Sequence, residues 1–94
     1  MYSNMHNPAS PGELLKEFIG DRSVSDVAAH IGVARATLSR IINGHNAVSV
    51  DLSIRLGEAL GLSPDFFSKA QLQYDLWLES KKKRRKIKPL TKAA

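Results

Sequence analysis

Residues 23–44, SVSDVAAHIGVARATLSRIING, restrict the possible folds of this chain more than any other stretch. Ser23 stands where a helix-capping residue belongs, and apolar residues recur after it at three- and four-residue spacing. The stripe stops at Gly32, and glycine readily takes the left-handed conformation that ends a helix. A second apolar stripe with the same spacing follows the glycine. The pattern predicts two short helices, residues 24–31 and 35–43, joined by a tight turn.

The second of these helices has a polar face that suits the major groove of DNA. Two helices joined by a glycine-containing turn are typical of the helix-turn-helix. An arginine can donate two hydrogen bonds to guanine, a hydroxyl can reach bases or phosphates, and an alanine methyl can contact thymine. An ordinary helical hairpin whose polar face meets only water is the alternative. We expect base contacts from the following side chains: Arg35, Ala36, Thr37, Ser39 and Arg40.

The rest of the chain adds three predicted helices. Residues 10–13, Ser-Pro-Gly-Glu, have the capping serine, the early proline and the glutamate of a helix start. Ser49 is placed to cap another helix, which a glycine closes, and Ser63 to cap a last one over residues 64–79. Because no strand-like alternation occurs, the fold class is all-α, with five helices.

The predicted helix over residues 64–79 is apolar on two sides. At about 100° per residue, a group of large side chains that includes Tyr74 and Trp77 falls within about one third of its circumference. Leu72 and Leu76 fall on the opposite side. Two exposed leucines alone would mean little. Beside these aromatic residues, however, they predict a dimer or partner interface that includes Leu72, Tyr74, Leu76 and Trp77.

Charge divides the chain into an acidic body and a basic tail. Residues 1–79 hold six basic and nine acidic side chains, hence a net charge of −3, whereas the remainder holds eight basic side chains and no acidic one. Residues 80–94 can bury little apolar surface, so we expect them to be disordered alone. They act either as an electrostatic arm on DNA phosphates or only as a solubilising terminus.

Residues 1–9 are polar and rich in Asn and Pro, which predicts a flexible arm before a domain over residues 10–79.

Four segments within residues 7–79 form a more specific combination: NPASPGELL, GVARATLSRIING, LSIRLGEALGLSPDFF and QLQYDLWL. Together they resemble the HigA-type antitoxins of the HigA/VapI group, Xre-like helix-turn-helix proteins of bacterial toxin–antitoxin modules. The resemblance implies a lambda-repressor-like fold and a homodimer. It also implies a palindromic operator in double-stranded DNA at the protein's own promoter and a partner toxin that is an mRNA-cleaving ribonuclease.

The resemblance further implies phosphate contacts for Ser23, Asn43 and His45. The amides at a helix start form a ready anion site, which agrees with this role for Ser23. Asn43 could instead only help to end its helix, and His45 could be a solvated loop residue. Where family members usually carry a capping serine, this chain has Ala34. We therefore expect the start of the recognition helix to be less firmly fixed, by about 1 kcal/mol.

Three other function classes compete with this interpretation. An enzyme is disfavoured because the three histidines lack ligand spacing and no nucleophile motif occurs, so we expect neither catalysis nor a metal or cofactor. A stand-alone Xre-like regulator, of the phage or restriction-control type, shares the fold and the DNA contacts and stays open as the alternative. A protein-binding module would not bind a duplex. With no cysteine, membrane-spanning apolar run or secretory leader visible, we expect a soluble cytoplasmic protein.

Overall fold

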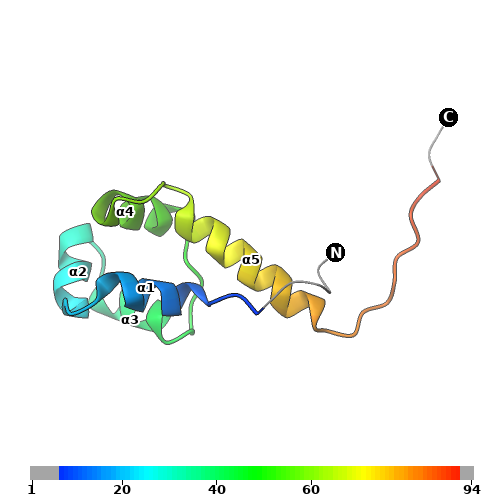
Figure 1. The fold of residues 1–94 in the computed structure, drawn as a ribbon, viewed down its shortest axis with the longest axis horizontal. Helices are drawn as coiled ribbons and strands as arrows, with labels where there is room; N and C mark the ends of the chain where they lie inside the picture. Colours follow the sequence, from blue (N-terminus) through cyan, green and yellow to red (C-terminus); the bar gives the residue numbers. More distant parts are fainter. Residues whose placement is uncertain (1–6, 92–94) are drawn as a thin grey trace.

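The computed structural model describes residues 7–91, and this part of the chain contains five helices and no strand (Figure 1). The helices are α1 Pro11–Ile19, α2 Val24–Ile31, α3 Arg35–Ile42, α4 Val50–Leu60 and α5 Phe66–Ser80. The predicted all-α fold with five helices is confirmed. Of the arm expected over residues 1–9, residues 1–6 lie outside the described part, as do residues 92–94 of the expected tail.

Serine side chains cap three helix starts, as the sequence predicts. Ser10 and Glu13 form a reciprocal capping box, in which each side chain accepts a hydrogen bond from the other's backbone N–H, at 3.2 and 2.8 Å. The Ser23 hydroxyl accepts from the N–H of Asp26 at 2.9 Å, and Ser49 caps α4 in the same way. Each such cap stabilises its helix by about 1 kcal/mol.

The start of α5 differs from the prediction. The helix begins at Phe66 and ends at Ser80, whereas the sequence pattern predicted residues 64–79. Ser63 does not cap it: the N-cap is Asp65, which makes no side-chain cap bond, and the Ser63 hydroxyl donates to the Asp65 carboxylate at 2.8 Å. That hydrogen bond lowers the pKa of Asp65. The two residues before Phe66 form a turn that the side chain of Ser53, on α4, holds in place.

Polar contacts attach the first turns of α5 to the rest of the bundle. Ser53 of α4 is completely buried, and its hydroxyl donates to the carbonyl of Pro64 at 2.7 Å while accepting from the N–H of Ser68 at 3.0 Å. The side chain of Gln71 accepts from the N–H of Val48 at 2.9 Å. Because each contact joins segments far apart in sequence, the angle at which α5 leaves the bundle is fixed by tertiary structure.

The hydrophobic core lies between the first four helices and the start of α5. On α1, Gly12 approaches α3 so closely that an added Cβ would overlap the carbonyl oxygens of Ile41 and Ile42. Phe18 of α1 meets Phe66 and Phe67 edge-on, at ring-centroid distances of 5.5 and 6.1 Å. The buried apolar residues are Leu15, Ile19, Val27, Ala28, Ile31, Leu38, Ile41, Val48, Leu52, Leu56 and Phe67.

Beyond its first turns, α5 projects away from the other helices (Figure 1). Of its large apolar residues, Phe67 is in the core and Phe66 packs against it, but Leu72 is 59% exposed. Tyr74 and Trp77 are only partly buried and lie beside each other, with ring centroids 6.1 Å apart. Within residues 7–91, this helix therefore packs on the domain mainly through its N-terminal part. No helix between residues 7 and 91 has the length and apolar character needed to cross a membrane.

Candidate nucleic-acid interface

The turn between α2 and α3 has the geometry that the sequence predicted. Gly32 takes the left-handed conformation, with φ 78° and ψ 33°, and its N–H bonds back to carbonyls in the last turn of α2. Val33 follows, donates to the carbonyl of Ala28 at 2.9 Å and packs against the core. Ala28 itself is 1% exposed, so the two helices meet closely at its small side chain. The helix-turn-helix is therefore a rigid unit.

The polar face of α3 points away from the core. Leu38 and Ile41 are buried on its inner side. At about 100° per residue, Ala36 and Arg40 lie opposite Leu38. Thr37 lies beside Arg40 and is exposed, and Ser39 lies beside Ala36 and is half-buried. Arg35, in the first turn, is exposed but lies about 60° around the helix from Leu38. The structure thus brings the five residues together on one helix, with Arg40 near the middle of the outer face.

Both arginines of this face are available to a ligand. Among residues 7–91, the ion pairs are Arg55–Asp51, Lys69–Asp65 and Lys82–Glu79, none of which includes Arg35 or Arg40. A guanidinium without an internal carboxylate partner keeps all its N–H donors for an external acceptor. The face can therefore supply the paired donors that a guanine edge accepts.

The predicted phosphate-contact residues lie at the ends of these two helices and are exposed. Ser23 is the N-cap of α2, and its hydroxyl accepts a backbone hydrogen bond but still has its own proton to donate. Asn43 is the C-cap of α3, which ends one residue earlier than predicted, and its amide lies 3.5 Å from the Ser39 hydroxyl. His45 lies in the following loop, held by a 2.8 Å bond from its N–H to the carbonyl of Arg40.

The start of α3 lacks a side-chain cap, as expected from Ala34. The backbone alone begins the helix, with the N–H groups of Thr37 and Leu38 donating to the Ala34 carbonyl at 3.0 and 3.3 Å. The first turn of α3 is therefore held by its neighbours in the core rather than by a local cap.

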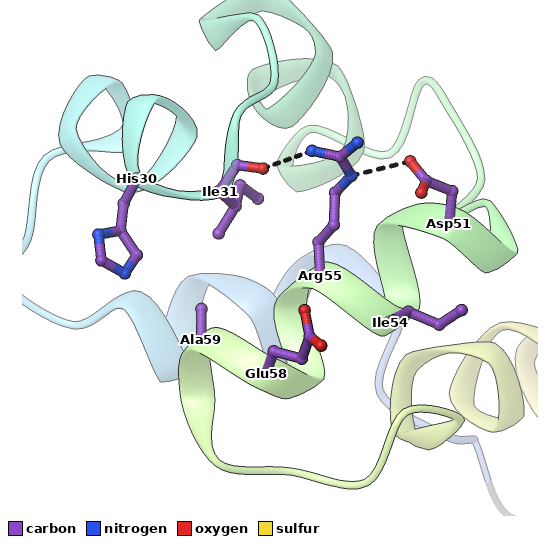
Figure 2. Close-up of a pocket in the computed structure, with 7 residues that line it drawn as sticks. All are labelled: His30, Ile31, Asp51, Ile54, Arg55, Glu58 and Ala59. Atoms are coloured by element: carbon purple, nitrogen blue, oxygen red, sulfur yellow. Dashed lines mark hydrogen bonds and ion pairs between the residues drawn. The ribbon is translucent and has the colours of Figure 1, made fainter.

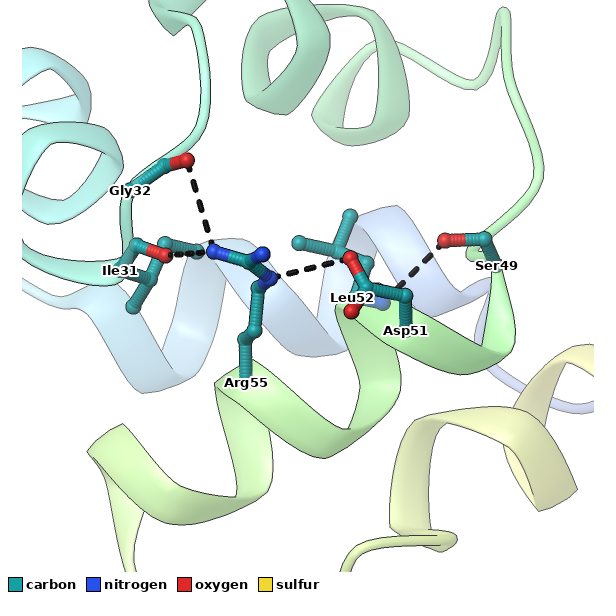
Figure 3. Close-up of polar contacts among 6 residues, drawn as sticks. All are labelled: Ile31, Gly32, Ser49, Asp51, Leu52 and Arg55. Carbon is teal, nitrogen blue, oxygen red and sulfur yellow. Dashed lines mark hydrogen bonds and ion pairs between the residues drawn. The ribbon is translucent and has the colours of Figure 1, made fainter.

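A contact that the sequence did not predict joins α4 to the turn between α2 and α3. The guanidinium of Arg55, on α4, donates to the carbonyl of Ile31 at 2.7 Å and lies 3.5 Å from that of Gly32 (Figure 3). A positive charge at the carbonyl end of α2 is favourable because the helix dipole is negative there. Asp51 orients the same side chain through a 3.0 Å bond, and this four-residue spacing was the only signal in the sequence.

An open depression lies beside this contact, between the end of α2 and the outer side of α4 (Figure 2). Its volume is about 480 Å³. Ala59 is exposed here, and Ile54 is 41% exposed. The lining residues are His30, Ile31, Asp51, Ile54, Arg55, Glu58 and Ala59.

Known proteins share both the sequence and this arrangement. Residues 20–67 match the family model described as helix-turn-helix. The antitoxin HigA-1 of Vibrio cholerae is 36% identical over 80 residues, which cover 82% of this chain and 75% of that protein. This chain belongs to the HigA family of helix-turn-helix proteins. The resemblance predicted from the four sequence segments is thereby confirmed.

Solved structures of HigA-family proteins have the same fold. An addiction module antidote protein of the HigA family from Coxiella burnetii superposes with a TM-score of 0.77 at 29% identity, covering 81% of this chain and 86% of that one. The Pseudomonas aeruginosa antitoxin HigA, solved with the higBA promoter, has a TM-score of 0.73 at 32% identity, covering 77% and 82%. The matched family model spans α2 to α4 and stops at the start of α5, so it leaves out the basic tail.

Proposed function

We propose that this HigA-family protein is a transcriptional repressor that binds a double-stranded operator at its own promoter and serves as the antitoxin of a toxin–antitoxin module. The observation that carries the proposal is the exposed side of α3, which presents two arginines that form no ion pair within residues 7–91, on a helix whose other side is buried. The Pseudomonas aeruginosa HigA bound to promoter DNA supports it. As a repressor of its own operon, the protein acts in the cytoplasm, where the DNA is.

In this proposal α3 enters the major groove. Arg40 and Ala36 face the base edges directly, while Arg35, Thr37 and Ser39 contact bases on either side. The backbone is held at Ser23, where the N-terminus of α2 attracts a phosphate, and at Asn43 and His45, where the chain leaves α3. Phosphate contacts position the protein, and base contacts give it sequence preference.

The repressor binds as a two-fold dimer. One helix-turn-helix covers too few base pairs for tight specific binding, whereas a symmetric pair reads two half-sites about one helical turn apart. The part of α5 from Leu72 to Ser80, which we call its second half, is the proposed interface, because it projects from the bundle with Leu72 exposed and with Leu76, Tyr74 and Trp77 incompletely buried. Pairing two such helices would cover the apolar side chains that one chain leaves open.

The partner toxin is an mRNA-cleaving ribonuclease encoded next to this protein's gene. Residues 1–79 carry a net charge of −3, which suits a basic nuclease. Co-expression with the neighbouring gene should yield a co-purifying complex and restore the growth that the toxin alone stops. Growth arrest that this protein does not relieve would leave the alternative, a stand-alone Xre-like regulator without a toxin.

DNA reading is tested by selecting binding sequences from a pool of random duplexes at fixed salt. A palindromic consensus with half-sites about one turn apart is expected. Recovery of no consensus, or of a single unrepeated half-site, would contradict the dimeric repressor.

The dimer interface is tested with a charged substitution at its centre and a matched control. Leu72→Glu should give a folded monomer in sedimentation that binds the selected operator poorly. Ala59→Glu, which adds the same charge at an exposed position of α4 beside the end of α2, should leave the dimer intact. An unaltered dimer in the Leu72→Glu variant would place the interface elsewhere.

A further inference from the structure

The basic tail, which we define as residues 81–94, has no part in the function proposed so far. It follows the end of α5 and contains eight Lys and Arg residues with no Asp or Glu. Every tail residue up to 91 is exposed, and residues 83–91 form neither helix nor strand. A run of positive charge this dense is the largest electrostatic feature of the chain.

Between residues 81 and 91, the ion pairs, hydrogen bonds and cation–π contacts with α5 come from Lys81 and Lys82. The Lys81 ammonium lies 4.2 Å from the ring centre of Trp77, and the Lys82 ammonium pairs with Glu79 at 2.9 Å and lowers the pKa of that carboxyl. Within the described part of the chain, the five cations that follow take part in no ion pair or hydrogen bond: Lys83, Arg84, Arg85, Lys86 and Lys88. These charges are therefore not used to hold the fold.

The tail also cannot fold on its own apolar surface. Ile87 and Leu90 are its large apolar residues, and they are 82% and 96% exposed. Continuing α5 past Ser80 would set like charges three and four residues apart, which destabilises a helix. A polyanion removes that repulsion, so the composition of the tail suits a ligand with many regularly spaced negative charges.

We propose that the basic tail is a second DNA-binding element that lies along phosphates next to the operator, without reading sequence. The proposal rests on the proposed function, because α3 brings the tail to DNA. Residues 1–79 are net negative and repel DNA at long range, so the tail supplies the attraction that they lack. Fourteen residues extend to about 45 Å, further than one helical turn of DNA at about 34 Å.

Three variants separate charge from the other properties of the tail. Truncation after Lys82 removes six cations but keeps the contacts of Lys81 and Lys82 with α5. A full-length variant in which Gln replaces the basic residues from 83 to 88 removes five charges at constant length. The control, Ile87→Ser with Leu90→Ser, keeps every charge. Dissociation constants are measured at several salt concentrations on the selected operator and on a scrambled duplex of equal length and composition.

Each phosphate contact that is lost should flatten the log–log salt dependence by about 0.9. We expect the truncated and Gln-substituted proteins to lose about 3 or more from this slope per chain, given the number of charges removed. Their affinity should fall by the same factor on both duplexes, so the operator preference stays unchanged. The apolar control should behave like the original protein.

Three results would overturn the proposal: equal slopes for truncated and full-length protein, weaker binding by the apolar control, or tighter binding after truncation. The last would mean that the tail neutralises the protein's own acidic residues. Failure of the proposed function has a different signature, because the full-length protein would then show no preference for any selected sequence. The slopes on the scrambled duplex decide the role of the tail even in that case.

Discussion

The outer face of α3 and the second half of α5 are both exposed, but they are supported differently. Behind α3 lies the core: Leu38 is fully buried, Gly12 of α1 touches its last carbonyls, and Arg55 holds the preceding turn. The second half of α5 projects beyond the other helices of residues 7–91 (Figure 1). It carries the incompletely buried apolar or aromatic side chains of Leu72, Tyr74, Leu76 and Trp77. One surface is polar and rigid, and the other is apolar and projects from the bundle.

This difference separates two kinds of interaction. A ligand read by hydrogen bonds requires donors held in fixed positions, which the packed side of α3 provides. An apolar surface needs no such precision, but it favours an association that removes it from water. The structure therefore favours DNA at α3 and another protein chain at α5, although both surfaces consist of exposed helix.

The largest difference between the two regions is expected when one aromatic ring is removed from each. Phe67→Ala should lower the free energy of unfolding by about 3–5 kcal/mol, because its ring is completely buried. Trp77→Ala should lower it by about 1 kcal/mol or less, since the side chain is only partly buried and its aromatic and cation–π contacts are with Tyr74 and Lys81. Urea unfolding of both variants in the monomeric Leu72→Glu background makes the comparison. Equal losses would show that the second half of α5 belongs to the core.

Support of α3 from α1 is tested by adding one methyl group. Gly12→Ala should destabilise the protein by about 3 kcal/mol, because the methyl would overlap backbone oxygens of Ile41 and Ile42 that cannot move independently. Gly61→Ala is the matched control, since it has open space around it and only the strain of a positive φ, worth about 1 kcal/mol. Thermal unfolding measures both. A smaller loss for Gly12→Ala than for the control would mean that α1 and α3 separate easily.

Removing a guanidinium from the outer face of α3 should affect DNA binding and not stability. Arg40→Ala and Arg35→Ala are each expected to cost about 1–3 kcal/mol on the operator and to relax preference at one base pair. Their melting temperatures should stay near that of the original protein, because neither side chain is buried. Lys16→Ala, an exposed charge on α1, is the control for net charge. Unchanged operator affinity in both arginine variants would show that this face does not read DNA.

The smallest change in stability is expected when the contact between Arg55 and the carbonyl end of α2 is removed. Arg55→Met should destabilise the protein by about 1 kcal/mol through loss of the bonds to the end of α2, a modest figure because the side chain is 41% exposed. Asp51→Asn keeps those bonds and removes only an exposed ion pair, so its effect should stay within about 0.5 kcal/mol. Chemical unfolding distinguishes them. Equal values would mean that the carbonyl contact contributes nothing to the stability of the helix-turn-helix.

Local signals in the sequence predicted most of the fold because their hydrogen bonds span only three or four residues. The capping box of Ser10 and Glu13, the caps at Ser23 and Ser49 and the left-handed Gly32 all form as predicted. Ser63 carries a similar signal, yet α5 starts later. There the buried hydroxyl of Ser53 bonds to the turn and to the first residues of α5, so a contact across eleven residues overrides the local cap.

The sequence alone therefore determined the number of helices, the helix-turn-helix and the face of α3 on which the arginines lie, because helical periodicity is a property of neighbouring residues. Tertiary structure alone decided how α1, α3 and α4 approach one another and how far α5 is covered. Gly12 against Ile41, Arg55 against Ile31 and Gln71 against Val48 join residues more than twenty positions apart. Such contacts form only after the helices have packed, so no spacing along the chain encodes them.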